Sequence, residues 1–131
     1  MRIVILLFSL FLLSGCYLAN GSPSSYIFWE SPPNMTKEKD KKISVNCYED
    51  ARNSLNDIQK KLFDKGSASW KDVYADKNEY KIFEEAVNLH QKYFFQCLYN
   101  SGYRFRPPLI WCLAQDGNNT RICIENMKYR N

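Results

Sequence analysis

Five cysteines and one histidine are the side chains of this sequence best suited to covalent or acid–base chemistry. Catalysis by His90 would need a reactive thiol or serine beside it, yet the chain has no G-x-S-x-G motif and its cysteine spacing favours disulfides. His90 also falls on an apolar stripe at helical spacing, which favours a partly buried helix residue over a catalytic base. A glycine-rich phosphate loop is missing as well. We therefore expect no enzyme activity, no catalytic residue, no cofactor and no metal site.

The first cysteine, Cys16, follows an apolar leader. Met1-Arg2 supplies one positive charge, and apolar residues then run from Ile3 to Phe8 and from Leu10 to Leu13. A basic start followed by a short apolar run is typical of a secretory signal. The run is shorter than the roughly 20 residues that a membrane-spanning helix needs. We expect residues 1–15 to be a signal peptide that is removed.

The tetrapeptide Leu13-Ser14-Gly15-Cys16 resembles the lipobox of bacterial lipoproteins, which has a branched apolar residue, two small residues and an obligatory cysteine. In that family the thiol receives a diacylglycerol and the new amino terminus is acylated, so the resemblance implies a lipid anchor on Cys16. Several acyl chains are needed, because one chain anchors only marginally. The alternative is an ordinary cleaved signal in which Cys16 is incidental. N-x-S/T sequons at Asn20, Asn34 and Asn118 keep a eukaryotic secreted protein open.

The residues after Cys16 bear on location. Tyr17 stands where an aspartate tends to retain enterobacterial lipoproteins at the inner membrane, so the resemblance implies the outer membrane with the body facing the periplasm. Residues 16–25 are rich in Gly, Ser and Pro, which predicts a flexible tether. At about 3.4 Å per extended residue it would reach at most about 30 Å. Such a tether lets the anchor and the folded body sit at different heights.

Composition limits the rest of the chain to one small domain, residues 26–131. Loss of Arg2 with the leader leaves 17 basic and 14 acidic residues, a net side-chain charge of +3. This mild balance does not suggest a nucleic-acid partner.

Four cysteines remain after Cys16: Cys47, Cys97, Cys112 and Cys123. An even number in an exported chain indicates two disulfides. Zinc is the competing interpretation, but the closely spaced C-x2–4-C pairs of zinc sites are absent, since successive gaps are 50, 15 and 11 residues.

Two long helices are predicted from apolar residues that recur every three or four positions. The first runs from a cap at Thr36 to about Asp64, where Lys65-Gly66 would end it. A connection over 67–75, with a possible helical turn, leads to Asp76, which would cap a second helix that continues to about Asn100 and ends at Gly102.

The two predicted helices also predict one disulfide. At 1.5 Å per residue, Cys47 and Cys97 both lie about 26–29 Å from the connection. In an antiparallel hairpin they would be level, each on an apolar stripe, so Cys47–Cys97 is the preferred bridge.

Two apolar segments, 109–114 and 120–124, flank an Asp-Gly-Asn turn sequence and predict a β-hairpin. A turn centred on Gly117-Asn118 places Cys112 opposite Cys123 across the strands. The second disulfide is therefore predicted to be Cys112–Cys123.

Two aromatic segments leave alternatives open. Tyr26–Trp29, before Pro32-Pro33, is an extended satellite of the core or an exposed strip that docks a partner. Tyr103-Arg104-Phe105-Arg106 alternates with period two, which predicts a strand with both arginines on one face. That strand is an edge strand with aromatics in the core, or Arg104 and Arg106 grip carboxylates or phosphates of lipopolysaccharide, peptidoglycan peptide or an acidic protein.

The same features resemble small, functionally uncharacterised lipoproteins of Gram-negative bacteria. These often join a lipobox to a Trp…Pro segment, a helix bearing one cysteine and a C-[ML]-x-x-x-G-[YF] stretch. Here Trp29 precedes Pro32-Pro33, Cys47 lies on the first predicted helix, and residues 97–103 have the sequence CLYNSGY. The likeness covers roughly residues 13–112 and implies a lipid-anchored envelope protein without naming a partner.

Together these features predict an α+β fold that is mostly helical, with an antiparallel helical hairpin followed by a small disulfide-linked β-hairpin. The predicted function is a non-catalytic envelope lipoprotein that binds a protein or cell-wall component in the periplasm. The alternative is an inhibitor or immunity-type lipoprotein that neutralises a hydrolase or toxin. The expected partners are the membrane, through the diacylglycerol and N-acyl chains on Cys16, and such an envelope component.

Overall fold

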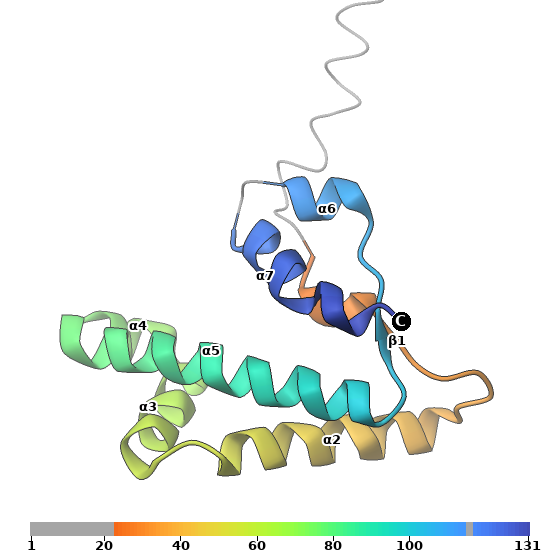
Figure 1. The fold of residues 1–131 in the computed structure, drawn as a ribbon. Helices are drawn as coiled ribbons and strands as arrows, with labels where there is room; N and C mark the ends of the chain where they lie inside the picture. The colour runs from red at the N-terminus through yellow and green to blue at the C-terminus, as the bar shows by residue number, and fades with distance from the viewer. Residues whose placement is uncertain (1–22, 115–116) are drawn as a thin grey trace, which may run out of the picture. The chain divides into compact units, whose positions relative to one another are not determined.

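The structure is a computed structural model that describes residues 23–114 and 117–131. The predicted signal peptide, the predicted lipidation site Cys16 and residues 16–22 of the predicted tether lie outside the described residues. Most of what is described is helical, with one two-stranded antiparallel sheet, as the sequence predicts at that level (Figure 1). None of the helices formed by the described residues is both long and apolar enough to cross a membrane.

The chain forms two compact units. We call Ser31–Tyr103 the helical unit, and the described residues up to Glu30 together with Arg104–Asn131 the aromatic unit. Residues 26–131, which the sequence predicts to be one domain, thus contribute to both units.

The helical unit is built around two long helices that lie side by side and run in opposite directions (Figure 1). Its elements are α2 (Lys37–Asn53), α3 (Asp57–Ala68), α4 (Trp70–Tyr74) and α5 (Lys77–Asn100). Cys47 of α2 is bonded to Cys97 of α5, with their Cα atoms 5.5 Å apart, so the predicted pairing is present. Leu55, Phe63 and Ala86 form a buried apolar cluster in the same unit.

The first predicted helix, 36–64, is wrong as a single element. Thr36 does cap it, since its Oγ1 accepts a hydrogen bond from Lys39 N, but α2 ends at Asn53 and α3 begins at Asp57. Asn56 starts the new helix through a capping box: its side chain accepts from Gln59 N, and Gln59 Oε1 accepts from Asn56 N. In a continuous helix, the N–H groups of Asn56 and Gln59 would bond to carbonyl groups one turn earlier. The capping box bonds them to side chains instead, so a new helix begins here.

Gly66 was predicted to end the first helix, and this is also wrong, because α3 continues to Ala68. The reason for a glycine is close packing: a Cβ atom at Gly66 would lie 2.3 Å from Phe83 Cε2 of α5. Gly66 therefore allows α3 to approach an aromatic ring.

The predicted ends of the second helix are confirmed. Asp76 accepts hydrogen bonds from the backbone N–H groups of Asn78 and Glu79, and Gly102, at φ +92°, follows the last turn. Gly102 N donates to Tyr99 O and Tyr103 N donates to Leu98 O, each at 3.0 Å, which is the Schellman arrangement. The predicted connection contains a short helix, α4.

The aromatic unit contains short elements only. They are the 3-10 helix η1 (Ser25–Phe28), the strands β1 (Trp29–Glu30) and β2 (Arg104–Phe105), the helices α6 (Leu109–Leu113) and α7 (Asn119–Asn126), and the 3-10 helix η2 (Met127–Tyr129). Strands β1 and β2 pair antiparallel, with Trp29 opposite Phe105. Aromatic rings fill the interior: Trp29 lies 5.4 Å from Phe105 and 5.6 Å from Tyr129, and Phe28 lies 5.0 Å from Trp111, between ring centroids.

The predicted β-hairpin over 109–124 is wrong, because its two apolar segments form helices α6 and α7 (Figure 1). The disulfide predicted from it is nevertheless present: Cys112 is bonded to Cys123, with Cα atoms 5.7 Å apart. Two packed helices bring these cysteines together as well as paired strands would. Apolar runs this short do not distinguish a strand from a buried helix, so the turn sequence decided the prediction alone.

Candidate functional site

His90 lies in the interior of the helical unit. Its side chain is only 7% exposed, it stacks on Phe63 at 4.5 Å, and Tyr48 meets it edge-on at 4.7 Å. Nε2 donates a hydrogen bond to the Tyr48 carbonyl oxygen at 3.2 Å, which fixes the proton on that nitrogen. These contacts agree with the predicted role of a buried helix residue.

Burial lowers the pKa of His90 below its ordinary value, because the charged imidazolium loses its hydration, while the Tyr48 carbonyl and Glu49 oppose this effect more weakly. The neutral ring therefore belongs to the folded state. Among residues 23–114 and 117–131, no group of three His, Cys, Asp or Glu side chains is placed to hold a metal ion.

Only the middle of the strand predicted at 103–106 is present, as β2 (Arg104–Phe105), which contains Arg104 but not Arg106. Tyr103 and Phe105 are buried, as the period-two pattern predicts, and Arg104 is half-buried. Arg106 is exposed just after the strand, and its backbone N–H donates to Phe28 O at 2.8 Å. Arg106 is therefore held at a fixed place on the surface of the aromatic unit.

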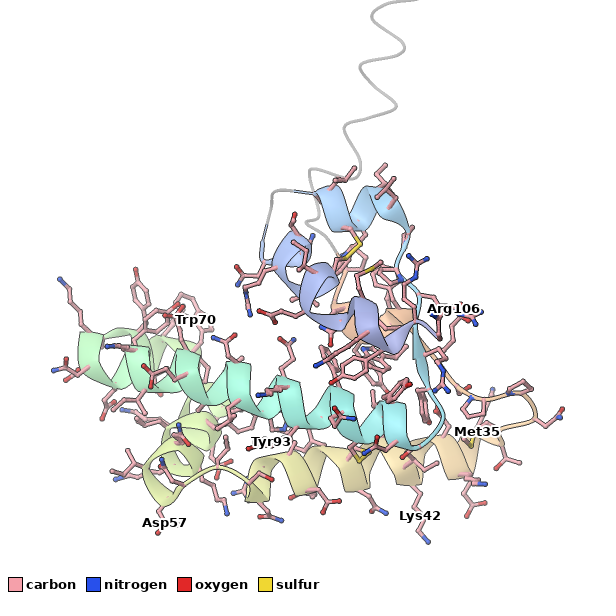
Figure 2. All side chains as sticks on the ribbon, in the orientation of Figure 1. Met35, Lys42, Asp57, Trp70, Tyr93 and Arg106 are labelled. Carbon is pink, nitrogen blue, oxygen red and sulfur yellow. A yellow bond between two sulfur atoms is a disulfide. The ribbon has the colours of Figure 1, made fainter. Side chains whose placement is uncertain are left out.

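Arg106 lines a shallow surface depression of about 590 Å³, which we call the arginine depression. Its lining residues are Arg106, Met127, Arg130 and Asn131. Arg106 Nη1 lies 3.3 Å from Glu30 Oε2, and both side chains are more than half exposed (Arg106 is labelled in Figure 2). Such an exposed ion pair is weak, so an anion could displace Glu30.

Arg130 is the second cation of the arginine depression. Its Nη1 contacts Met127 Sδ at 4.0 Å, and no carboxylate of the described ranges forms an ion pair with it. Two guanidinium groups on one concave surface suit a ligand with carboxylate or phosphate groups, because each can donate two parallel hydrogen bonds.

The sequence pattern placed Arg106 with Arg104, whereas the arginine depression combines Arg106 with Arg130. The sequence does not mark Arg130 as a candidate site residue, because no periodic pattern surrounds it. It reaches the depression because Tyr129 packs on Trp29 in the aromatic interior, and this contact joins residues 100 positions apart. A sequence alone does not reveal such a contact.

A second exposed surface lies on the helical unit. Trp70 and Tyr74 of α4 are 57% and 60% exposed, and their rings meet edge-on at 5.8 Å. Tyr80 of α5 extends the group, with its ring 5.1 Å from that of Tyr74. Figure 2 shows Trp70 projecting from this part of the helical unit. Trp70 and Tyr74 lie in the predicted connection and Tyr80 in the second predicted helix, but the sequence does not predict that their rings form an exposed group.

Comparison with protein-family models, with curated proteins and with solved structures gives no match for this chain. The function proposed below therefore rests on the residues of this chain and their geometry.

Proposed function

We propose that this protein is a non-catalytic envelope lipoprotein that binds an anionic envelope component at the arginine depression. The observation that carries the proposal is the convergence of Arg106 and Arg130 on one concave surface. Among the described residues that line the depression, none has a nucleophilic or general-base side chain, which suits binding rather than turnover.

Lipid anchoring on Cys16 is the second part of the proposal. It is supported by the resemblance of Leu13–Cys16 to a lipobox and by two disulfides, which persist in oxidising compartments such as the periplasm. We propose the outer membrane, with the folded units in the periplasm, because Tyr17 replaces the aspartate that favours inner-membrane retention.

The anionic component would bind by displacing Glu30 from Arg106 and by adding a partner to Arg130. Because the proposed contacts join opposite charges at an exposed surface, affinity should fall with added salt. Carboxylates of peptidoglycan peptides and phosphates of lipopolysaccharide both fit this chemistry.

The test is a titration of the purified full chain with lipopolysaccharide and with peptidoglycan fragments. Arg106→Glu combined with Arg130→Glu should lower affinity for one of them about 100-fold, because two charge-assisted contacts become repulsive. Glu30→Gln should raise it about twofold by removing the competing carboxylate.

Arg121→Glu is the matched control, since Arg121 lies in the same unit and already pairs with Glu125 at 3.0 Å. It should leave affinity nearly unchanged. Because Arg121→Glu changes the net charge by half as much as the double variant, a loss of about tenfold in it would mean that net charge, not the arginine depression, controls binding.

A second function is favoured by the exposed Trp70–Tyr74 pair: an inhibitor or immunity-type lipoprotein that neutralises a hydrolase or toxin. Trp and Tyr dominate the energetically important positions of protein interfaces, and an exposed pair on a short helix suits insertion into a partner's cleft. Trp70→Ser with Tyr74→Ser should then abolish inhibition of a captured hydrolase, whereas Tyr93→Ser, also exposed in the helical unit, should not. Loss of capture in the arginine variant alone would favour the first function.

A further inference from the structure

Helix α6 exposes three aliphatic side chains on one side. Leu109, Ile110 and Leu113 are between 63% and 72% exposed. At 100° per residue they occupy one sector of roughly 100°, whereas Trp111 points to the opposite side and is buried. We call these three residues the aliphatic face.

The aliphatic face is held outward by the rest of α6. Trp111 packs on Phe28 at 5.0 Å and on Phe105 at 6.5 Å, and Cys112 is bonded to Cys123 of α7. Because one side of α6 is fixed in the aromatic interior, the helix cannot rotate to bury its leucines. Adjacent large aliphatic side chains that remain exposed mark a surface for another molecule or for a membrane.

The chain outside the described residues ends beside this helix. Trp111 Nε1 donates a hydrogen bond to the carbonyl oxygen of Pro23 at 2.8 Å. Pro23 is the seventh residue after Cys16, and seven residues span at most about 25 Å when fully extended. An anchor on Cys16 therefore keeps α6 within about 25 Å of the bilayer surface.

We propose that the aliphatic face docks on the lipid bilayer, with Leu109, Ile110 and Leu113 at the boundary between headgroups and acyl chains. This inference rests on the proposed anchoring at Cys16. A five-residue helix is far too short to span a membrane, but a short apolar face suits the interfacial layer. The anchor raises the local concentration of lipid at α6, so a small face is sufficient.

The charge of the aromatic unit also favours a lipid bilayer as the partner of the aliphatic face. Residues 23–30 and 104–131 include five arginines and lysines against three acidic residues, a net charge of +2, whereas residues 31–103 have twelve basic and eleven acidic residues, a net charge of +1. Basic residues near an anionic membrane surface each add to binding. The unit that carries the aliphatic face and the end of the tether thus has the larger net positive charge, although it is the shorter of the two.

The test uses the full chain, expressed in a Gram-negative host, purified and reconstituted in vesicles of phosphatidylethanolamine and phosphatidylglycerol. A phospholipid with a photoreactive diazirine in its acyl chain is included, and labelled peptides are mapped by mass spectrometry. We expect label on residues 109–113 and none on Ile58 of α3, which is 64% exposed in the helical unit. Ile58 is therefore the internal control for exposure without docking.

The triple variant Leu109→Ser, Ile110→Ser, Leu113→Ser should lower the label on the 107–114 peptide about tenfold, because its burial in hydrocarbon is lost. Ile58→Ser should not change it. These side chains are exposed, so the variant keeps the aromatic interior, which circular dichroism and an intact Cys112–Cys123 bridge would verify.

The same sample separates the two proposals. Acylated Cys16 with α6 unlabelled overturns the docking face and leaves the anchor standing. Unmodified Cys16 overturns the anchoring, and α6 label that falls in the triple variant would then support docking by itself. If Cys16 is unmodified and α6 is unlabelled, both the lipid anchor and the docking face are wrong.

Discussion

The helical unit and the aromatic unit use different means to build a stable interior. In the helical unit, long helices present apolar stripes to one another, and nearly equal numbers of basic and acidic residues cover the outside. In the aromatic unit the longest element is the eight-residue helix α7, and large rings with a disulfide replace helix length. Each unit contains one disulfide, so the comparison teaches that the surfaces proposed for the anion and for the membrane lie in the unit where long regular elements are scarce and aromatic rings form the interior.

Removing each disulfide should have the largest effect on stability, and it tests whether the two units are stabilised separately. Replacing Cys47 and Cys97 by serine should lower the free energy of unfolding by about 4 kcal/mol, and replacing Cys112 and Cys123 by about 3 kcal/mol, from the entropy of the opened loops. Urea denaturation measures both losses, and amide hydrogen exchange resolved by residue assigns each to a unit. The helical unit should keep its α2 and α5 protection in the Cys112/Cys123 variant. Equal loss of protection in both units would mean that they unfold together.

Gly66 tests how closely the helices of the helical unit are packed. Gly66→Ala should destabilise the protein by about 1–3 kcal/mol, because the new methyl group would overlap the Phe83 ring. Gly117→Ala is the matched control in the aromatic unit, since the nearest atom to its Cβ lies at an ordinary 3.6 Å. Thermal unfolding of both variants measures the difference, and a stable Gly66→Ala protein would show that α3 can move away from α5.

Protonation of His90, in the helical unit, should give the smallest change in the free energy of unfolding. Because its pKa is lower in the folded state, the unfolded chain binds more protons, so stability is greatest above about pH 6.5 and falls as acidification passes down through the folded pKa. The contribution of one such group is at most about 1.4 kcal/mol per pH unit. His90→Gln should flatten the urea midpoint between pH 7 and pH 5, and a wild-type midpoint that does not fall over this range contradicts the assignment.

Prediction from sequence succeeded where a pattern extends over many residues. The caps at Thr36 and Asp76 and the end at Gly102 follow from helical periodicity. The Cys47–Cys97 bridge is present as predicted, although the single helix assumed in its distance argument is not. The predicted helix failed at Asn56, because a capping box interrupted an apolar stripe that continued beyond it.

Short segments were less predictable for a physical reason. Residues 109–113 and 119–126 lack the length that separates helix from strand, and the packing of Trp111 on Phe28 and Phe105 decides in favour of helix. Of the candidate site, Arg106 was found because alternation marked its strand. Arg130 was not, because its place depends on a contact across 100 residues.

The hydrogen bond from Trp111 to Pro23 also has a mechanical consequence. Any pull transmitted along the polypeptide from its amino-terminal side arrives at Pro23, beside α6. There the covalent link between Cys112 and Cys123 shares the load between two short helices instead of peeling one of them away. A protein fastened at one end and loaded at the other would gain resistance to shear from a crosslink at this position.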